Sequence, residues 1–215
     1  HCTSNNTIFG TQMKDFPTTD ISMVCDMSSD IFSRRVNVAD FDLIYAGAQK
    51  NMGPAGATLV IVKDEILGKT GRDIPAYLDY STHIGKESMF NTPPVFAIYV
   101  SMLTLEWLKD LGGVEAIEKI NHQKADLIYS EMDRNSLFEG TAVKEDRSNM
   151  NACFLLKDEA AHKETFDKMW KDAGISGING HRSVGGYRAS MYNALPLESV
   201  QTLVDVMQQL EKDNG

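Results

Sequence analysis

The chain has 215 residues, a formal net charge of −9, and a composition that is 42% hydrophobic and 24% charged. Such a chain is long enough to bury a sizeable core without disulfides, and its composition excludes a disordered or fibrous protein. The excess of 30 acidic over 21 basic residues repels phosphate backbones. We therefore expect no nucleic acid and no anionic membrane among its partners.

The cysteines and the apolar runs indicate the compartment. Cys2, Cys25 and Cys153 are scattered without pairing or metal-ligand spacing, which predicts reduced thiols and no metal site. No run approaches the roughly 20 apolar residues of a membrane-spanning helix. We expect a cytoplasmic protein. The chain begins at His1 and continues into a polar stretch, Thr3–Thr7, that predicts a turn; we expect an N-terminal part of the protein to be missing from it.

The first half of the chain alternates strand and helix patterns. Short β-branched runs predict strands at 21–25, 42–46 and 57–62. Because these runs lack polar alternation, we expect them to be buried on both faces in a mostly parallel sheet. Pro93 and Pro94 open an apolar helix that ends near Gly112, and a second, amphipathic helix follows over 114–132.

The last part of the chain has a different pattern of predicted elements. It predicts a strand at 149–156, a helix at 159–172, a strand at 187–192 and a final helix from Pro196. This order is typical of a small α+β layer. We therefore predict an α/β protein with a domain boundary near residues 133–138.

Lys50 lies in the most informative segment, which reads YAGAQKNMGPAG over residues 45–56. A strand runs directly into small residues, and Gly53 and Gly56 permit unusual backbone dihedrals. A lysine held there against a packed sheet can form a Schiff base with a carbonyl compound. The alternative is an exposed lysine in a glycine-containing hairpin turn. The order of residues excludes a phosphate-binding P-loop.

Asp26 ends the first predicted strand, and ligands of open α/β sheets bind at such strand ends. A carboxylate there can keep the ring nitrogen of a pyridine cofactor protonated, so that the ring accepts electrons. The alternative is a structural role, as a helix N-cap or in an Asx turn with Ser28 or Ser29.

His181, Arg182 and Arg188 surround a Gly-Gly pair in an otherwise acidic chain. Guanidinium groups bind carboxylate and phosphate oxygens two at a time, so this cluster predicts a site for a small dianion. The alternative for each arginine is a surface salt bridge. Asn91 and Thr92 precede a helix-starting proline, where they either cap the helix or direct backbone N–H groups at an anion.

Motifs along nearly the whole chain match one family in order. They are Asn6–Thr7, Cys25–Ser29 (CDMSS), Ala46–Asn51 (AGAQKN), Gly53–Gly56 (GPAG), Phe90–Pro94 (FNTPP), Arg147–Met150 (RSNM) and Gly180–Asn193 (GHRSVGGYRASMYN). In these motifs the chain resembles the phosphoserine aminotransferases, class V enzymes that use pyridoxal phosphate in serine biosynthesis.

The resemblance implies fold type I architecture, with residues 1–135 in the large domain, residues 136–215 in the small domain, and an obligate homodimer. Lys50 matches the lysine that holds pyridoxal phosphate, and Asp26 the aspartate that pairs with its ring nitrogen. The remaining matches are Thr7 and Gln49 beside the cofactor, Asn91 and Thr92 reaching its phosphate across the dimer, and His181, Arg182 and Arg188 on the substrate's anionic groups.

The family's activity would be transamination between glutamate and 3-phosphohydroxypyruvate, giving 2-oxoglutarate and O-phosphoserine. The family's ring-stacking aromatic residue and its glycine-rich phosphate loop precede the segment that matches His1, so the resemblance implies that the missing N-terminal portion is also a partner. Two alternatives stay open. One is another fold type I enzyme, such as a serine–glyoxylate aminotransferase or a cysteine desulfurase. The other is a truncated chain that only binds a partner.

Overall fold

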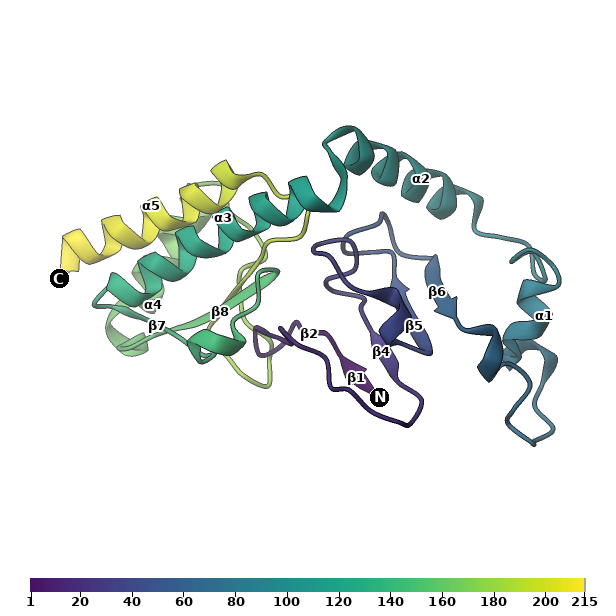
Figure 1. Ribbon diagram of the computed structural model, residues 1–215. Coiled ribbons are helices and arrows are strands. Elements are labelled where there is room, and N and C mark those ends of the chain that lie inside the picture. Colours follow the sequence, from purple (N-terminus) through teal and green to yellow (C-terminus); the bar gives the residue numbers. More distant parts are fainter. Residues whose placement is uncertain (215) are drawn as a thin grey trace.

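The computed structural model describes residues 1–214 and has two regions joined by one long helix (Figure 1). The N-terminal region contains a four-stranded sheet, α1 (Tyr80–Ile84) and α2 (Val95–Asp110). The C-terminal region contains a three-stranded sheet and the remaining helices. No helix within residues 1–214 is long and apolar enough to cross a membrane.

The four-stranded sheet has the order β1 (Cys2–Thr3), β4 (Val24–Asp26), β5 (Leu43–Gly47) and β6 (Thr58–Val62). The first three strands are parallel and β6 is antiparallel to β5. This confirms the predicted mostly parallel sheet. The prediction that all three apolar runs are buried on both faces is wrong for β6, which is partly exposed along its length. It is also wrong at the start of the first run, where Ile21 is exposed and lies outside β4. Strand β6 returns directly from β5 through the connection of residues 48–57, so it pairs antiparallel at the edge of the sheet.

The N-terminal polar stretch is not a simple turn. Cys2–Thr3 forms β1, and β2 (Asn5–Asn6) pairs antiparallel with β3 (Thr11–Gln12). Gly10 closes this hairpin: its φ is +70° and its N–H donates to the Asn6 carbonyl oxygen at 3.0 Å. Asparagine-rich segments favour turns locally, but here backbone pairing, of β1 with the distant β4 and of β2 with β3, determines the structure.

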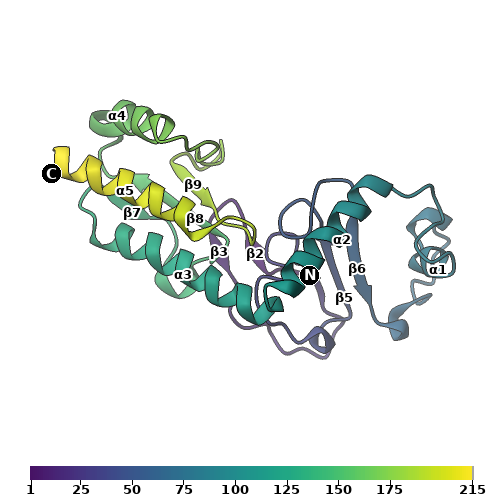
Figure 2. The same ribbon diagram turned by 90° about the horizontal axis from the view of Figure 1, so that it is seen from above.

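The helices and strands of the C-terminal region follow the predictions closely, except for β7, which was not predicted. They are α3 (Gly113–Arg134), β7 (Phe138–Gly140), β8 (Asn151–Leu156), α4 (Glu159–Asp172), β9 (Tyr187–Ser190) and α5 (Leu197–Asn214). The three strands are antiparallel in the order β7-β8-β9, and α3 and α5 lie side by side (Figures 1 and 2). Short 3₁₀ helices occur at Val38–Asp40, Asp64–Ile66, Ala76–Leu78 and Lys144–Asp146.

Two separate hydrophobic cores stabilise these regions. The N-terminal core gathers nine buried residues, among them Cys25, Ile44 and Met52. The C-terminal core gathers 20 buried residues, and it includes the C-terminal half of α3 from Ala125 onward. The domain boundary near 133–138 stays a prediction.

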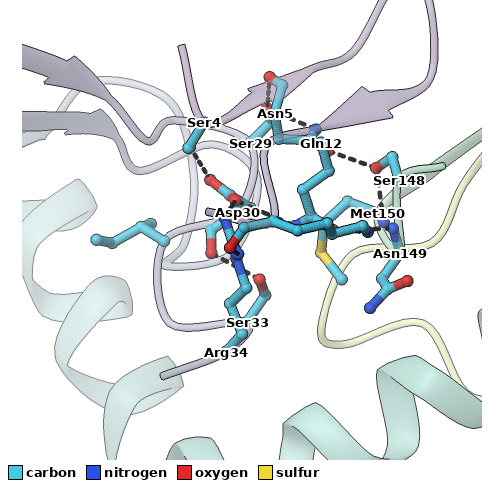
Figure 3. A network of polar contacts seen from close by, with 12 residues as sticks. Ser4, Asn5, Gln12, Ser29, Asp30, Ser33, Arg34, Ser148, Asn149 and Met150 are labelled. Atoms are coloured by element: carbon cyan, nitrogen blue, oxygen red, sulfur yellow. Dashed lines mark hydrogen bonds and ion pairs between the residues drawn. The ribbon is translucent and has the colours of Figure 1, made fainter. Parts of the chain in front are cut away.

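A buried polar network joins the two regions (Figure 3). The Asn5 side-chain amide donates to Ser29 Oγ at 2.8 Å and to Asn151 Oδ1 at 2.9 Å, and it accepts from Ser148 Oγ. Beside it, Asp30 accepts from Gln12 Nε2 at 3.1 Å. Such a network is stable only when its members are paired, so it fixes the position of the β2–β3 hairpin against β8.

Candidate active site

Lys50 lies in the turn between β5 and β6, and its side chain is half-buried. Its Nζ donates to Thr7 Oγ1 at 3.0 Å, although 43 residues separate the two in the sequence. Thr7 directly follows β2, so the β2–β3 hairpin brings it to the end of β5. The exposed-turn alternative therefore does not describe Lys50, whose amine is held against another segment.

The turn that carries Lys50 depends on close backbone packing. A Cβ added to Gly53 would lie 2.8 Å from Ser101 Oγ and 3.1 Å from Ser101 Cα on α2, so only glycine fits here. A Cβ at Gly47 would lie 2.5 Å from Gln49 Oε1, because the exposed Gln49 side chain folds back over it. The small residues of this segment thus allow the turn to pack closely between the sheet and α2.

Asp26 is the last residue of β4 and is paired with Tyr45 of β5 in the parallel register. Its Oδ1 accepts from the Ser28 backbone N–H at 2.8 Å. The Asx-turn alternative is therefore present in the structure, and it does not exclude a second role for the carboxylate. Burial, and then the charge of Asp26, raise the pKa of Tyr45 above its ordinary value, which indicates that the Tyr45 hydroxyl lies near this carboxylate.

The Tyr45 side chain and its neighbour His1 were not among the predicted site residues. The Tyr45 hydroxyl lies 3.0 Å from Nε2 of His1. Tyr45 lies opposite Asp26 on β5, and His1 directly precedes β1 on the other side of β4, so the register places both residues on the same face of the sheet as Asp26. The parallel register of β4 and β5 was the signal that could have revealed Tyr45, since it places residues 26 and 45 opposite each other.

Arg188 lies on β9 opposite Cys153 of β8. Its neighbours Tyr187 and Ala189 are buried in the C-terminal core, and the alternation of the strand places Arg188 on the other face. The Nε of Arg188 is buried and has no hydrogen-bond partner within residues 1–214. A buried, unpaired guanidinium N–H is costly unless an acceptor arrives, so the group is suited to an anionic ligand.

His181 and Arg182 lie in the loop that precedes β9. His181 Nδ1 is 2.6 Å from Ser183 Oγ, and Arg182 is exposed. Gly180 closes this loop, since an added Cβ would overlap the Gly185 carbonyl oxygen at 1.9 Å. Across residues 1–214, none of His181, Arg182 and Arg188 forms a salt bridge, so the surface-ion-pair alternative does not describe them here.

The Thr7 turn connects the Lys50 and Arg188 segments. The Cys153 thiol donates to the Ile8 carbonyl oxygen at 3.5 Å, and a Cβ at Gly10 would lie 2.8 Å from the Asn151 carbonyl oxygen. The hairpin therefore packs directly on β8, one strand away from Arg188. Lys50, Thr7 and Arg188 thus belong to segments in direct contact, although the last is 138 residues from the first in the sequence.

The structure does not bring Asn91 and Thr92 to this site. Both are exposed in the segment between α1 and α2, and in the described part of the chain they form no hydrogen bond to Lys50, Thr7 or Asp26. Neither caps α2, whose N-cap residue is Pro94. Within residues 1–214, no group of three or more potential metal-ligating side chains is found.

A half-buried lysine amine that follows one strand of a mostly parallel sheet, where the neighbouring strand ends in a carboxylate, is typical of enzymes that bind carbonyl compounds through an amine. The sequence profile of the class-V aminotransferases matches residues 1–203. The chain belongs to the class-V aminotransferase family, and its mixed α/β fold with a mostly parallel sheet confirms the predicted fold class.

Individual relatives agree with this assignment. The phosphoserine aminotransferase of Flavobacterium psychrophilum is 74% identical over 211 residues, which cover 98% of this chain and 59% of the relative. The solved structure of the enzyme from Bacillus circulans subsp. alkalophilus is 43% identical, with a TM-score of 0.94 over 99% of this chain and 59% of that chain.

A third relative is the crystal structure of a phosphoserine aminotransferase from Trichomonas vaginalis with bound PLP. It is 35% identical, with a TM-score of 0.90 over 96% of this chain and 59% of that one. The chain therefore spans about three fifths of the length of the relatives it matches.

Proposed function

We propose that this chain is part of a phosphoserine aminotransferase, which transfers the amino group between glutamate and 3-phosphohydroxypyruvate to give 2-oxoglutarate and O-phosphoserine. The observation that carries the proposal is the Lys50 amine, which is held 3.0 Å from Thr7 Oγ1 beside the strand end that carries Asp26. The high identity to named phosphoserine aminotransferases supports the choice of substrates.

The residues present fit pyridoxal phosphate as the cofactor. Lys50 would hold it covalently, and Asp26 would pair with its ring nitrogen, leaving Thr7 and Gln49 to contact it. The buried Nε of Arg188 lacks an acceptor, as expected of a group whose partner is a substrate carboxylate. Bound pyridoxal phosphate supplies a ring that accepts the electron pair left when the substrate loses its α-proton.

The chemical work of the chain's own residues follows from their positions. The Lys50 amine would take the proton from the substrate Cα as a base and would then donate it as an acid to the cofactor carbon that keeps the amino group. The hydrogen bond to Thr7 orients this amine. The Arg188 guanidinium binds the α-carboxylate, while His181 and Arg182 bind the distal anion, either the side-chain carboxylate of glutamate or the phosphate of the other substrate. Charge-assisted hydrogen bonds accommodate both anion shapes.

The proposal includes assembly with further polypeptide. The exposed apolar side chains of α2, among them Val95 and Phe96 at 69% and 74% exposure, need a cover. We infer that a second copy of the enzyme, as a homodimer, and the missing N-terminal portion together provide it. In that dimer Asn91 and Thr92 would reach the cofactor phosphate of the partner subunit. We place the enzyme in the cytoplasm.

The proposal is tested with Lys50→Ala in the full-length enzyme. Transamination of O-phosphoserine with 2-oxoglutarate is expected to fall below detection, because no other described amine occupies this position. Lys63→Ala is the matched control, since Lys63 follows β6 and pairs with Asp42 at 3.4 Å outside the site. Full activity of Lys50→Ala would contradict the proposal. A wild-type enzyme that prefers serine with glyoxylate, or that desulfurates cysteine, would point instead to another fold type I enzyme.

A further inference from the structure

Three asparagines, Asn51, Asn121 and Asn193, meet in the interior between the two regions. They are only 4%, 1% and 3% exposed. Asn51 directly follows Lys50, Asn193 lies five residues after Arg188, and Asn121 is on α3. Buried amides are costly unless they are hydrogen-bonded, so their partners explain what they hold in place.

The three side chains bind three consecutive carbonyl oxygens. Asn51 Nδ2 donates to the Ile31 oxygen at 3.0 Å, Asn193 Nδ2 to the Phe32 oxygen at 3.0 Å, and Asn121 Nδ2 to the Ser33 oxygen at 3.2 Å. These carbonyls belong to the segment that follows Asp26. Phe32 there has a φ of +57°, a left-handed conformation that a bulky residue adopts only when its surroundings enforce it.

The asparagines also bind one another. The Asn193 backbone N–H donates to Asn51 Oδ1 at 2.9 Å, and Asn121 Nδ2 donates to Asn193 Oδ1 at 2.9 Å. Of their side-chain polar atoms, only Asn121 Oδ1 has no partner within residues 1–214. The network therefore ties the Lys50 turn directly to the segment that continues from Arg188.

Lys124 holds the same segment from its other side. Its side chain is fully buried, and its Nζ donates to the carbonyl oxygens of Met191, Tyr192 and Leu195 at 3.0, 3.0 and 3.1 Å. These carbonyls lie before and after Asn193. Lys124 of α3 thus binds the carbonyl oxygens of this stretch, and Asn51 of the Lys50 turn binds its Asn193 N–H. These bonds leave the stretch little freedom to shift.

We propose that Asn51 and Asn193 are positioning residues that set the placement of Arg188 relative to Lys50, and so hold the substrate carboxylate at the correct distance from the reacting amine. This inference rests on the proposed function. We call the three asparagines the asparagine joint. A displacement of about 1 Å at a reacting centre can lower a rate by about 100-fold, which makes such a joint important without any contact to substrate.

The test uses Asn51→Ala and Asn193→Ala in the full-length holoenzyme, with Asn135→Ala as the matched control. Asn135 is equally buried, at 2%, and its side chain also bonds an acceptor side chain and a backbone carbonyl, those of Glu131 and Met207, but it lies in the C-terminal core away from the site. All three variants are expected to lose similar stability in denaturant unfolding and to retain the visible absorption band of the lysine-bound cofactor.

Only the joint variants are expected to lose catalytic efficiency. We expect kcat/KM for glutamate to fall about 10- to 100-fold in Asn51→Ala and Asn193→Ala, and less than twofold in Asn135→Ala. A second readout does not depend on activity: in the cofactor-free protein, hydrogen exchange of the peptide containing Asn193 should accelerate in Asn51→Ala and stay unchanged in Asn135→Ala. If Asn51→Ala does not fold, Asn193→Ala, which keeps its own backbone N–H bond to Asn51, gives the same kinetic comparison.

The outcomes separate the two claims. An active wild-type enzyme in which the joint variants lose no more kcat/KM than Asn135→Ala would overturn the asparagine joint alone. A wild-type enzyme that does not transaminate glutamate would overturn the proposed function, and the inference about catalytic positioning with it.

Discussion

The two regions of the molecule bury their apolar residues to different extents. The C-terminal region has a core of 20 buried residues, with Phe138, Phe154, Phe166 and Tyr187 packed against one another at ring-centroid distances of 4.9–6.4 Å. The N-terminal core has nine. On α2, which lies beside the N-terminal sheet (Figure 2), only Ala97 and Leu108 are buried. One region closes its own core, whereas the other exposes apolar surface.

Because of this difference, the residues that stabilise the fold and the proposed reacting residues lie largely in different regions of the chain. Lys50, Asp26 and Thr7 all belong to the region with the smaller core. Strand β9 carries both core residues and a proposed binding residue, because Tyr187 and Ala189 pack in the C-terminal core while Arg188 lies on the opposite face of the strand. We therefore expect substitutions in the C-terminal core to change the free energy of unfolding, and substitutions at the sheet edge to change rates.

The largest effect on stability is expected for Phe166→Ala. Phe166 is fully buried and contacts the rings of Phe138 and Tyr187 edge to face. Removing it should lower the free energy of unfolding by about 3–5 kcal/mol, measured by denaturant unfolding of the full-length enzyme. Val143→Ala, at a position 63% exposed in the same region, should change it by less than about 0.5 kcal/mol. Equal losses in the two variants would contradict a closed C-terminal core.

Substitutions in the candidate site should change the reaction rate and leave the free energy of unfolding nearly unchanged. Asp26→Asn is expected to leave cofactor bound and stability nearly unchanged but to slow proton removal by about 100-fold or more, because the neutral amide no longer keeps the ring nitrogen charged. Rapid-mixing measurements of the half-reaction with glutamate would test this. Asp42→Asn is the control, since Asp42 also accepts a backbone N–H, that of Met23 at 2.7 Å, near the opposite end of the strands. Unchanged turnover in Asp26→Asn would leave Asp26 with the Asx turn alone.

Arg188→Ala tests β9, the strand that carries both core residues and the proposed carboxylate-binding residue. The unfolding free energy should stay within about 1 kcal/mol of wild type, because the guanidinium lacks an ion-pair partner within residues 1–214. Steady-state kinetics should show a loss of kcat/KM of about 30- to 100-fold for both glutamate and O-phosphoserine. Arg35→Ala, which removes an exposed arginine paired with Glu115, should leave KM unchanged. A glutamate KM that Arg188→Ala does not raise would contradict carboxylate binding by Arg188.

A pH-dependent effect on stability is expected at the connection between the regions. Burial lowers the pKa of Lys124 from 10.5 to about 8. Between these values the unfolded chain retains a proton that the folded chain has lost, so stability from this group rises with pH. The slope should be about 1.4 kcal/mol per pH unit from pH 8 to 10.5.

Unfolding of wild type and of Lys124→Met measured from pH 7 to 10 would show this dependence. Relative to Lys124→Met, the wild type should gain stability as the pH rises above 8 and show a constant difference below it. A difference that does not change with pH over the whole range would mean that Lys124 titrates as an exposed lysine.

The sequence predicted the helices well because their signals are local. The amphipathic pattern and the following Gly174 predict α4 at the bounds observed, Glu159–Asp172. Strands of two or three residues, such as β1 and β2, are too short to show alternation; β1 exists only through pairing with the distant β4, and β2 through pairing with β3 in a short hairpin. The antiparallel direction of β6 is likewise a property of pairing that its own residues do not encode.

The residues of the candidate site likewise divide into those that local sequence predicts and those that it does not. Lys50, Asp26 and Arg188 are recognisable because each carries reactive chemistry within a distinctive local segment. The asparagine joint cannot be recognised from the sequence, because an isolated asparagine predicts only a turn or a cap. Asn51 and Asn193 acquire a role only when residues 142 positions apart meet. Local chemistry therefore predicts reacting groups, and the contacts that position them require the structure.

The central claim is that the amine of Lys50 holds the cofactor covalently at the rim of the sheet. The most direct measurement is borohydride reduction of the full-length holoenzyme followed by peptide mass mapping. We predict that the mass of reduced pyridoxal phosphate is found on the peptide containing Lys50, and that it disappears in Lys50→Ala. Attachment to a different lysine, or an unmodified Lys50 peptide from an active enzyme, would contradict the claim.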